Sequence, residues 1–151
     1  MRINKTVFLS VTLLLGSLSS ISAQEISFPK AKNSTNFKLV IQGIDKIEGE
    51  IRIAVFDSEE TYTKEPIHAI VLPVDSTTMV WEEKNMPYGD YAIAVYHDKN
   101  KNGKIDTNLL GIPKEDYGFS NDARGRFGPA SWKDSMFKLV DATYSTEINI
   151  K

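Results

Sequence analysis

Short runs in which apolar and polar residues alternate are the feature that most constrains the fold of this chain. The clearest are residues 37–41 and 50–57, where every second residue is apolar. A period of two is typical of half-buried β-strands, whereas a helix repeats its apolar residues every three or four positions. The predicted core face consists of Phe37, Leu39, Ile41, Ile51, Ile53, Val55, Ile93 and Val95.

Two further β-prone runs, which are neighbours in the sequence, and one run that is apolar throughout predict additional strands. Asp75 and Ser76 separate two β-prone runs, which predicts a hairpin. Residues 91–96 are apolar on both faces, as expected of a central strand, and the Tyr91 hydroxyl is placed to anchor the preceding tight turn. The predicted strands are residues 37–41, 50–57, 68–74, 77–83, 91–96, 137–140 and 144–150.

Between these strands, residues 99–132 have no periodicity, and five glycines and two prolines interrupt them. This segment predicts one long loop. A parallel α/β fold would need helical stretches that the sequence lacks. We therefore expect an all-β fold, an antiparallel sandwich of about seven strands.

The first 23 residues resemble a signal peptide. Arg2 and Lys5 precede an apolar stretch over residues 7–18, and small residues lead to Ala23, after which we expect cleavage. The apolar stretch is too short for a stable membrane span. The sequence thus predicts a signal peptide over residues 1–23, a polar linker over 24–36 and a domain over 37–151, exported to the periplasm or the cell exterior.

Composition narrows the classes of partner. The chain has no cysteine, which excludes disulfides and zinc-thiolate sites. Signal cleavage removes two of the 18 basic residues and none of the 20 acidic ones, leaving 16 against 20. A net charge of about −4 without a basic face argues against nucleic acid and against an anionic membrane surface.

Polar residues concentrate just after the predicted central strand. Their order follows the oxygen-ligand spacing of a calcium loop, with Gly103 at the sharp turn. Such a site would take a hard, oxygen-loving ion. The predicted ligands are the side chains of Asp98, Asn100, Asn102 and Asp106 and the carbonyl group of Lys104.

The match to a calcium loop ends at its twelfth position, which is Leu109 where a bidentate Glu should be. Glu115 or Asp116 could substitute for it. No helical pattern flanks the loop, so it is not an EF-hand. The alternative is that Asn100 and Asn102 serve the turn alone, by bonding to their own backbone.

Aromatic and polar residues are interleaved further along the long loop, a mixture that lines sugar or peptide sites. The alternative is that the aromatic side chains tie the loop to the sheet. The candidate ligand-binding residues are Tyr117, Phe119, Asn121, Phe127 and Trp132.

No catalytic residue is assigned. By strand parity His97 lies on the face of Ile93 and Val95, which favours a histidine at the core rim, bonded to backbone, over a catalytic base. Ser120 lacks the glycine two residues later that a nucleophile elbow needs.

Several motifs resemble the bacterial domain of unknown function 2141 family: Asn85-Met86-Pro87-Tyr88-Gly89-Asp90-Tyr91-Ala92, His97-Asp98-Lys99-Asn100, Asn102-Gly103-Lys104, Asp106-Thr107-Asn108, Gly111-Ile112-Pro113-Lys114-Glu115, Tyr117-Gly118-Phe119-Ser120-Asn121 and Phe127-Gly128-Pro129. The likeness covers residues 37–151. It implies an exported bacterial protein with an immunoglobulin-like or transthyretin-like sandwich and no settled activity, and it supplies no catalytic residues.

These observations favour an exported, non-enzymatic module with a calcium-ordered loop that binds a protein or glycan at the cell envelope. One alternative is a calcium-assisted hydrolase using His97 with Asp106, Glu115 or Asp116. Another is a purely structural domain. The enzyme would need a deep pocket joining His97 to a carboxylate, whereas the module needs only an exposed, ordered loop.

Overall fold

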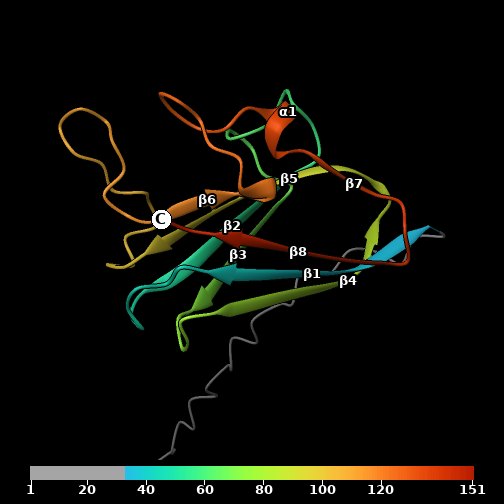
Figure 1. Cartoon of the computed structure of the whole chain (residues 1–151), viewed down its shortest axis with the longest axis horizontal. Coiled ribbons are helices and arrows are strands. Elements are labelled where there is room, and N and C mark those ends of the chain that lie inside the picture. Colours follow the sequence, from blue (N-terminus) through green and yellow to red (C-terminus); the bar gives the residue numbers. More distant parts are fainter. Residues whose placement is uncertain (1–32) are drawn as a thin grey trace, which may run out of the picture.

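Two β-sheets packed face to face make up the described part of the chain, residues 33–151 of the computed structural model (Figure 1). The first sheet has the strand order β4 (Met79–Pro87), β1 (Ser34–Gln42), β8 (Thr143–Asn149). The second has the order β3 (His68–Pro73), β2 (Glu50–Phe56), β5 (Gly89–Asp98), β6 (Tyr117–Phe119), and β7 (Phe137–Leu139) also pairs with β5.

The predicted all-β sandwich is confirmed, with one strand more than the seven expected. All pairs are antiparallel except β1 with β8, which run parallel. Strand β1 begins at Ser34, three residues before the predicted start of the domain. The predicted signal peptide and residues 24–32 of the predicted linker lie outside the described residues.

The main core lies between the two sheets and contains all eight residues of the predicted core face. Each of them is at most 1% exposed. Phe37 also stacks on Phe137 and Tyr144, with ring centroids 5.8 and 6.0 Å away, so β1, β7 and β8 are joined at one end of the core. The period-two alternation therefore identified the buried face correctly.

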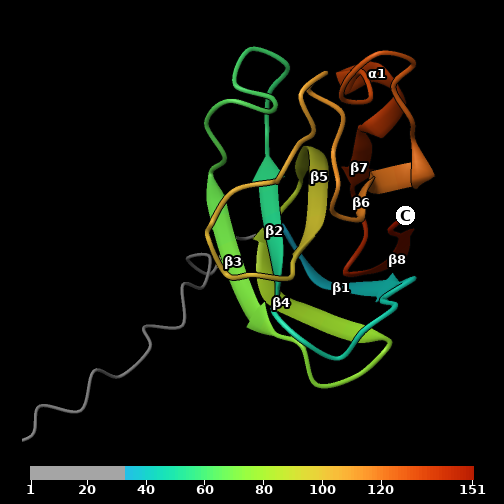
Figure 2. The ribbon, with the colours of Figure 1, turned by 90° about the vertical axis from the view of Figure 1, so that its left-hand side faces the viewer.

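A second apolar cluster covers the opposite face of β5. It consists of Phe56, Tyr62, Ala92, Phe119 and Ala130. Figure 2 shows β2 between β3 and β5, and the segment that carries β6, α1 and β7 lies on the other side of β5. Because side chains bury both faces of β5, its sequence is apolar at consecutive positions, as predicted for a central strand.

The predicted hairpin around Asp75 and Ser76 is wrong. Strand β3 pairs with β2, and β4 pairs with β1 in the other sheet, so residues 74–78 cross between the sheets. The crossing follows from burial, because Met79 and Trp81 of β4 are both 8% exposed and pack into the core between the sheets. The closeness of two β-prone runs in the sequence therefore does not determine which sheet each run joins.

Three short elements lie within or at the end of the predicted loop. They are β6, a 3-10 turn over Ser120–Asp122 that follows it, and the four-residue helix α1 (Trp132–Ser135). Ser131 caps α1 by accepting a hydrogen bond from the Asp134 N–H. The predicted tyrosine anchor is present: the Tyr91 hydroxyl donates to the Pro87 carbonyl oxygen over 3.0 Å.

Candidate metal centre

Strand β5 delivers the long loop, and its last two residues are both buried. His97 and Asp98 each have 0% exposure and, by strand alternation, lie on opposite faces of the sheet. The loop returns at β6, where the Asp116 carbonyl oxygen accepts a hydrogen bond from the His97 N–H over 2.9 Å. Figure 1 shows the loop leaving the sandwich beside the C-terminus. The two ends of the loop are thus fixed to each other and to the sheet.

The Asp98 carboxylate is the anchor of the loop. Its Oδ1 atom accepts the Asn102 N–H over 3.0 Å, and its Oδ2 atom accepts the Gly103 N–H over 2.8 Å and the Arg52 Nε–H over 2.6 Å. Burial by itself raises the pKa of Asp98, but these donors outweigh burial and hold the pKa below its ordinary value. Asp98 is therefore an anion at neutral pH, and Gly103 turns around it with a left-handed φ of 79°.

Three further candidate ligands converge on one another. The side-chain amides of Asn100 and Asn102 donate to the two carboxylate oxygens of Asp106, over 2.7 and 3.0 Å. Their Oδ1 atoms accept the N–H groups two residues on, over 3.1 Å from Asn102 and 2.8 Å from Lys104. These are the hydrogen bonds of the turn-only alternative. Each amide oxygen keeps a second lone pair that a cation could use, although the amide NH₂ groups are the ones that face Asp106.

Glu115 lies where the predicted calcium loop lacked a carboxylate. Its side chain is buried, and its two oxygens accept the Lys99 N–H and the Asp106 N–H, each over 3.0 Å. One carboxylate therefore spans the first and last residues of the turn. Asp116 instead pairs with the Lys99 ammonium group over 2.9 Å. Of the two substitutes considered from the sequence, Glu115 is the one at the loop.

The side chains around the loop include the ligand types that a hard divalent cation takes. They offer the carboxylates of Asp98, Asp106 and Glu115 and two amide oxygens, which are the ligand types that calcium takes. Calcium would supply two positive charges among three carboxylates, of which Arg52 offsets one. The Lys104 carbonyl group was the fifth predicted ligand, and Lys104 lies exposed in the same turn.

Arg52 was missed as part of this site. Its side chain lies on the face of β2 away from the core residues Ile51 and Ile53, and its ion pair with Asp98 depends on the pairing of β2 with β5; a second ion pair joins it to Glu50 over 3.0 Å. The opposite charges of Glu50 and Arg52, which lie on the same outer face of β2, were the only signal in the sequence for these ion pairs.

The five candidate ligand-binding residues do not line one surface. Phe119 is 6% exposed and belongs to the second apolar cluster, and Trp132 packs against that cluster, edge-on to Tyr62 with ring centroids 5.6 Å apart. Phe127 is 97% exposed. This placement matches the alternative in which most of the loop aromatics tie the loop to the sheet.

The two remaining candidate residues, Tyr117 and Asn121, also have structural contacts. Tyr117 carries the Arg124 guanidinium over its ring at 5.6 Å. The Asn121 side-chain amide donates to the carbonyl oxygens of Asp134 and Met136, over 3.0 and 2.9 Å, and so holds α1 in place.

His97 is bonded to backbone, as expected of a core-rim histidine. Its Nε2 atom lies 2.7 Å from the Glu48 carbonyl oxygen, and its Nδ1 atom lies 3.9 Å from an oxygen of Asp45. Sequence reasoning missed Asp45, because residues 43–49 read only as a turn and no motif connects them to His97. Only the pairing of β2 with β5 brings that turn beside the end of β5.

Among the comparisons with known proteins, only the one with protein families gives a match. No curated protein and no solved structure matches the chain. Within residues 33–151, the structure contains no helix with the length and apolar character needed to cross a membrane. Residues 39–147, more than half of the chain, match the family described as an uncharacterized protein conserved in bacteria, DUF2141. The chain therefore belongs to the DUF2141 family, as its motifs had indicated.

Proposed function

We propose that this protein is an exported, non-enzymatic binding module in which calcium orders the loop after β5. The observation that carries the proposal is the set of oxygen donors in one turn: the Asn100 and Asn102 amides bond to Asp106, Asp98 accepts the Asn102 N–H, and Glu115 bonds to both ends of the turn. Oxygen donors drawn from one turn are how loops of this chemistry bind calcium.

The affinity follows from the charge of the site. Three carboxylates face the turn, but the Arg52 guanidinium already occupies one oxygen of Asp98 at 2.6 Å. Fewer uncompensated charges weaken calcium binding, and extracellular modules bind it with dissociation constants of about 10⁻⁴ to 10⁻³ M. We expect this site in the same range, which suits an ion that is abundant outside the cell.

The part of the loop beyond the turn supplies the binding surface in this proposal. Leu109 and Leu110 are 106% and 84% exposed, and Ile112 is 54% exposed. Neighbouring aliphatic side chains that project fully into water are typical of protein contact sites. Aliphatic groups favour a protein partner over a glycan, because they offer no stacking face or hydrogen bond to a sugar.

The burial of His97 supports a binding role over the alternative of a calcium-assisted hydrolase. A general base must reach the proton that it removes, and the His97 side chain is 0% exposed with its Nε2 atom bonded to a carbonyl group. A purely structural domain would not need exposed leucines at the tip of an ordered loop.

A capture experiment tests the proposal. The immobilised protein is exposed to an envelope extract in calcium and in chelator, alongside a Leu109→Ser/Leu110→Ser variant and a Val80→Ser/Val140→Ser control. We expect a partner that is retained in calcium, released by chelator and lost only with the leucine variant. Equal retention by all three proteins, or retention that ignores chelator, would contradict the proposed surface.

Export is tested separately. The basic and apolar order of residues 1–23 supports it. The mass of the protein recovered from the envelope fraction should correspond to a chain that begins at Gln24. Recovery of the intact chain from the cytoplasm would contradict export without affecting the calcium loop.

A further inference from the structure

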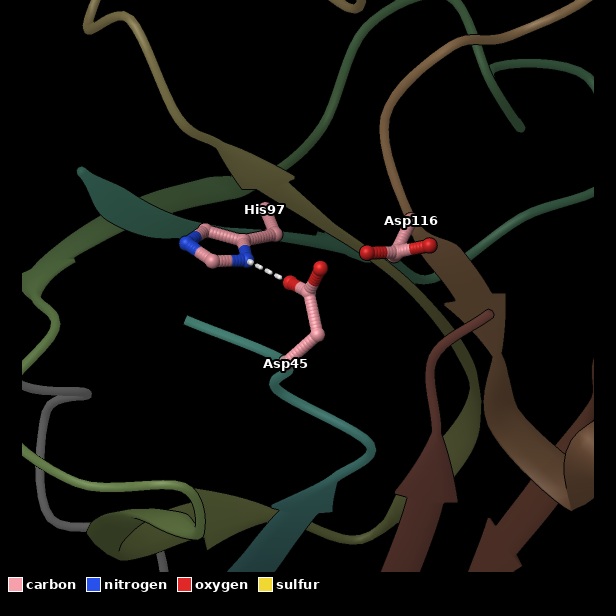
Figure 3. A group of neighbouring side chains, drawn as sticks. All are labelled: Asp45, His97 and Asp116. Carbon is pink, nitrogen blue, oxygen red and sulfur yellow. Dashed lines mark ion pairs between the residues drawn. The ribbon is translucent and has the colours of Figure 1, made fainter. Parts of the chain in front are cut away.

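A second cluster of titratable groups lies next to the loop, on the core side of the sheet. It consists of His97 at the end of β5, Asp45 in the turn over residues 43–49, and Asp116 just before β6 (Figure 3). One ligand atom from each of the three lies within 4.8 Å of the other two. Figure 3 shows the imidazole ring edge and the Asp45 carboxylate facing each other across this space.

The hydrogen bonding of His97 leaves one nitrogen aimed into the cluster. Its Nε2 atom lies 2.7 Å from the Glu48 carbonyl oxygen, which can only accept, so Nε2 carries a proton and donates it. In the neutral ring, Nδ1 then bears a lone pair. Within residues 33–151, Nδ1 has no hydrogen-bond partner although the side chain is fully buried. A buried polar atom without a partner is rare and calls for a ligand.

We propose that His97 Nδ1, Asp45 and Asp116 form a site for a divalent transition-metal ion of the zinc type. An imidazole nitrogen with two carboxylates is a ligand set that zinc and its neighbours accept, and three protein ligands leave a fourth position open. Histidines that bind metal almost always donate their other ring N–H to a carbonyl or carboxylate, which fixes the tautomer. Glu48 holds His97 in that orientation.

The spacing of the donors needs only a small adjustment. Tetrahedral zinc with bonds of about 2.0 Å holds its donor atoms roughly 3.3 Å apart. His97 Nδ1 and the Asp45 oxygen are 3.9 Å apart, and the Asp45 side chain is 52% exposed and therefore free to move inward. The backbone of its turn lies close to the end of β5, because a Cβ atom at Gly49 would lie 2.3 Å from the Asp98 carbonyl oxygen.

Lys99 is the internal competitor for this site. Its ammonium group lies 3.0 Å from Asp45 and 2.9 Å from Asp116, so it neutralises the same two carboxylates that the metal would use. Its hydrogen bond lowers the pKa of Asp45. The lysine stem is flexible and 25% exposed, so the ammonium group can swing into water when a dication binds. The metal therefore binds in exchange for one lysine charge.

Zinc binding to the purified protein tests the proposal, measured by calorimetry in millimolar calcium so that the neighbouring loop does not compete. We expect one bound Zn²⁺, weakened about tenfold or more by Asp45→Asn or by Asp116→Asn. Lys99→Met should tighten binding by about tenfold, because it removes a competing positive charge. Asp75→Asn, a matched change at an exposed loop, should leave binding unchanged.

Nitrogen NMR of the two histidines identifies the ligand atom without any substitution in the buried core. We expect zinc to shift the His97 Nδ1 resonance and to leave Nε2 protonated. A shift confined to His68 would overturn the proposal. So would binding that is indifferent to both Asp45→Asn and Lys99→Met, or the absence of binding in the wild type and in Lys99→Met alike.

Discussion

Replacement of Asp98 by asparagine should be among the most destabilising single changes at the loop, even without a metal ion. The side chain is completely buried, and its carboxylate accepts hydrogen bonds from the N–H groups of Asn102 and Gly103 and from Arg52. Asparagine keeps the volume but has a single acceptor oxygen. Its amide group would face a donor, so at least one partner of the carboxylate would be left without an acceptor.

The magnitude follows from these contacts. A hydrogen bond to a charged group contributes about 1.5 to 3 kcal/mol, and breaking a buried ion pair from one side costs about 3 to 5 kcal/mol. Arg52 keeps its contact with Glu50 at 3.0 Å, which moderates the loss. We therefore expect the free energy of unfolding to fall by about 3 to 4 kcal/mol, with a melting temperature lower by roughly 10 to 15 °C.

Urea unfolding in chelator measures the effect, in a double-mutant cycle of Asp98→Asn with Arg52→Met. The cycle should give a favourable coupling energy of about 1 to 3 kcal/mol, because the two residues share one short ion pair. A loss below about 1 kcal/mol for Asp98→Asn would mean that the carboxylate does not anchor the loop. Zero coupling would remove Arg52 from the site.

Three further predictions concern the fold and are measured by the same urea unfolding. Ile93→Ala, at a fully buried core position, should lower the free energy of unfolding by about 2 to 5 kcal/mol. Tyr91→Phe removes the hydroxyl that donates to Pro87 and should lower it by about 1 kcal/mol. Gly118→Ala would place a Cβ atom 2.6 Å from Ile148 and should lower it by about 1 to 3 kcal/mol. A neutral result at any of these positions would contradict the packing described there.

The predictable part of the fold was the part encoded by local alternation. Phe37, Leu39 and Ile41 could be assigned to one buried face because a strand has a strict period of two. Pairing could not be read in the same way. The crossing of residues 74–78 between the sheets depends on which partner strand buries Met79 and Trp81, and that is a property of the whole chain.

The short elements could not be predicted from the sequence for a related reason. β6 has only three residues, Tyr117–Phe119, which is too few to show a period. It pairs with β5, and its Gly118 lies close to β8, where a Cβ atom would lie 2.6 Å from Ile148. The aromatic residues around it were visible in the sequence, but their division between the second apolar cluster and the surface was not.

The loop after β5 shows the same division between local and distant contacts. The order of Asp98, Asn100, Asn102 and Asp106 within nine residues is local information; in the structure the two amides bond to Asp106, and Asp98 accepts the Asn102 N–H. The carboxylate at the far end of the loop had two sequence candidates, and only the return of the chain to β6 distinguishes Glu115. His97 and the two carboxylate groups beside it, those of Asp45 and Asp116, come from three separate parts of the chain, so no sequence motif contains them.

Thermal unfolding in calcium and in chelator tests the calcium-ordered loop most directly. An ion that binds only the folded state, at ten times its dissociation constant, stabilises by about 1.4 kcal/mol. We expect the melting temperature to rise by roughly 3 to 8 °C and to fall again with chelator. Asp106→Asn should abolish the response, because it removes a carboxylate from the turn, whereas Asp75→Asn should keep it. Identical melting of the wild type in about 10 mM calcium, ten times the weakest expected dissociation constant, and in chelator would contradict the account and leave the loop as a turn held by its own hydrogen bonds.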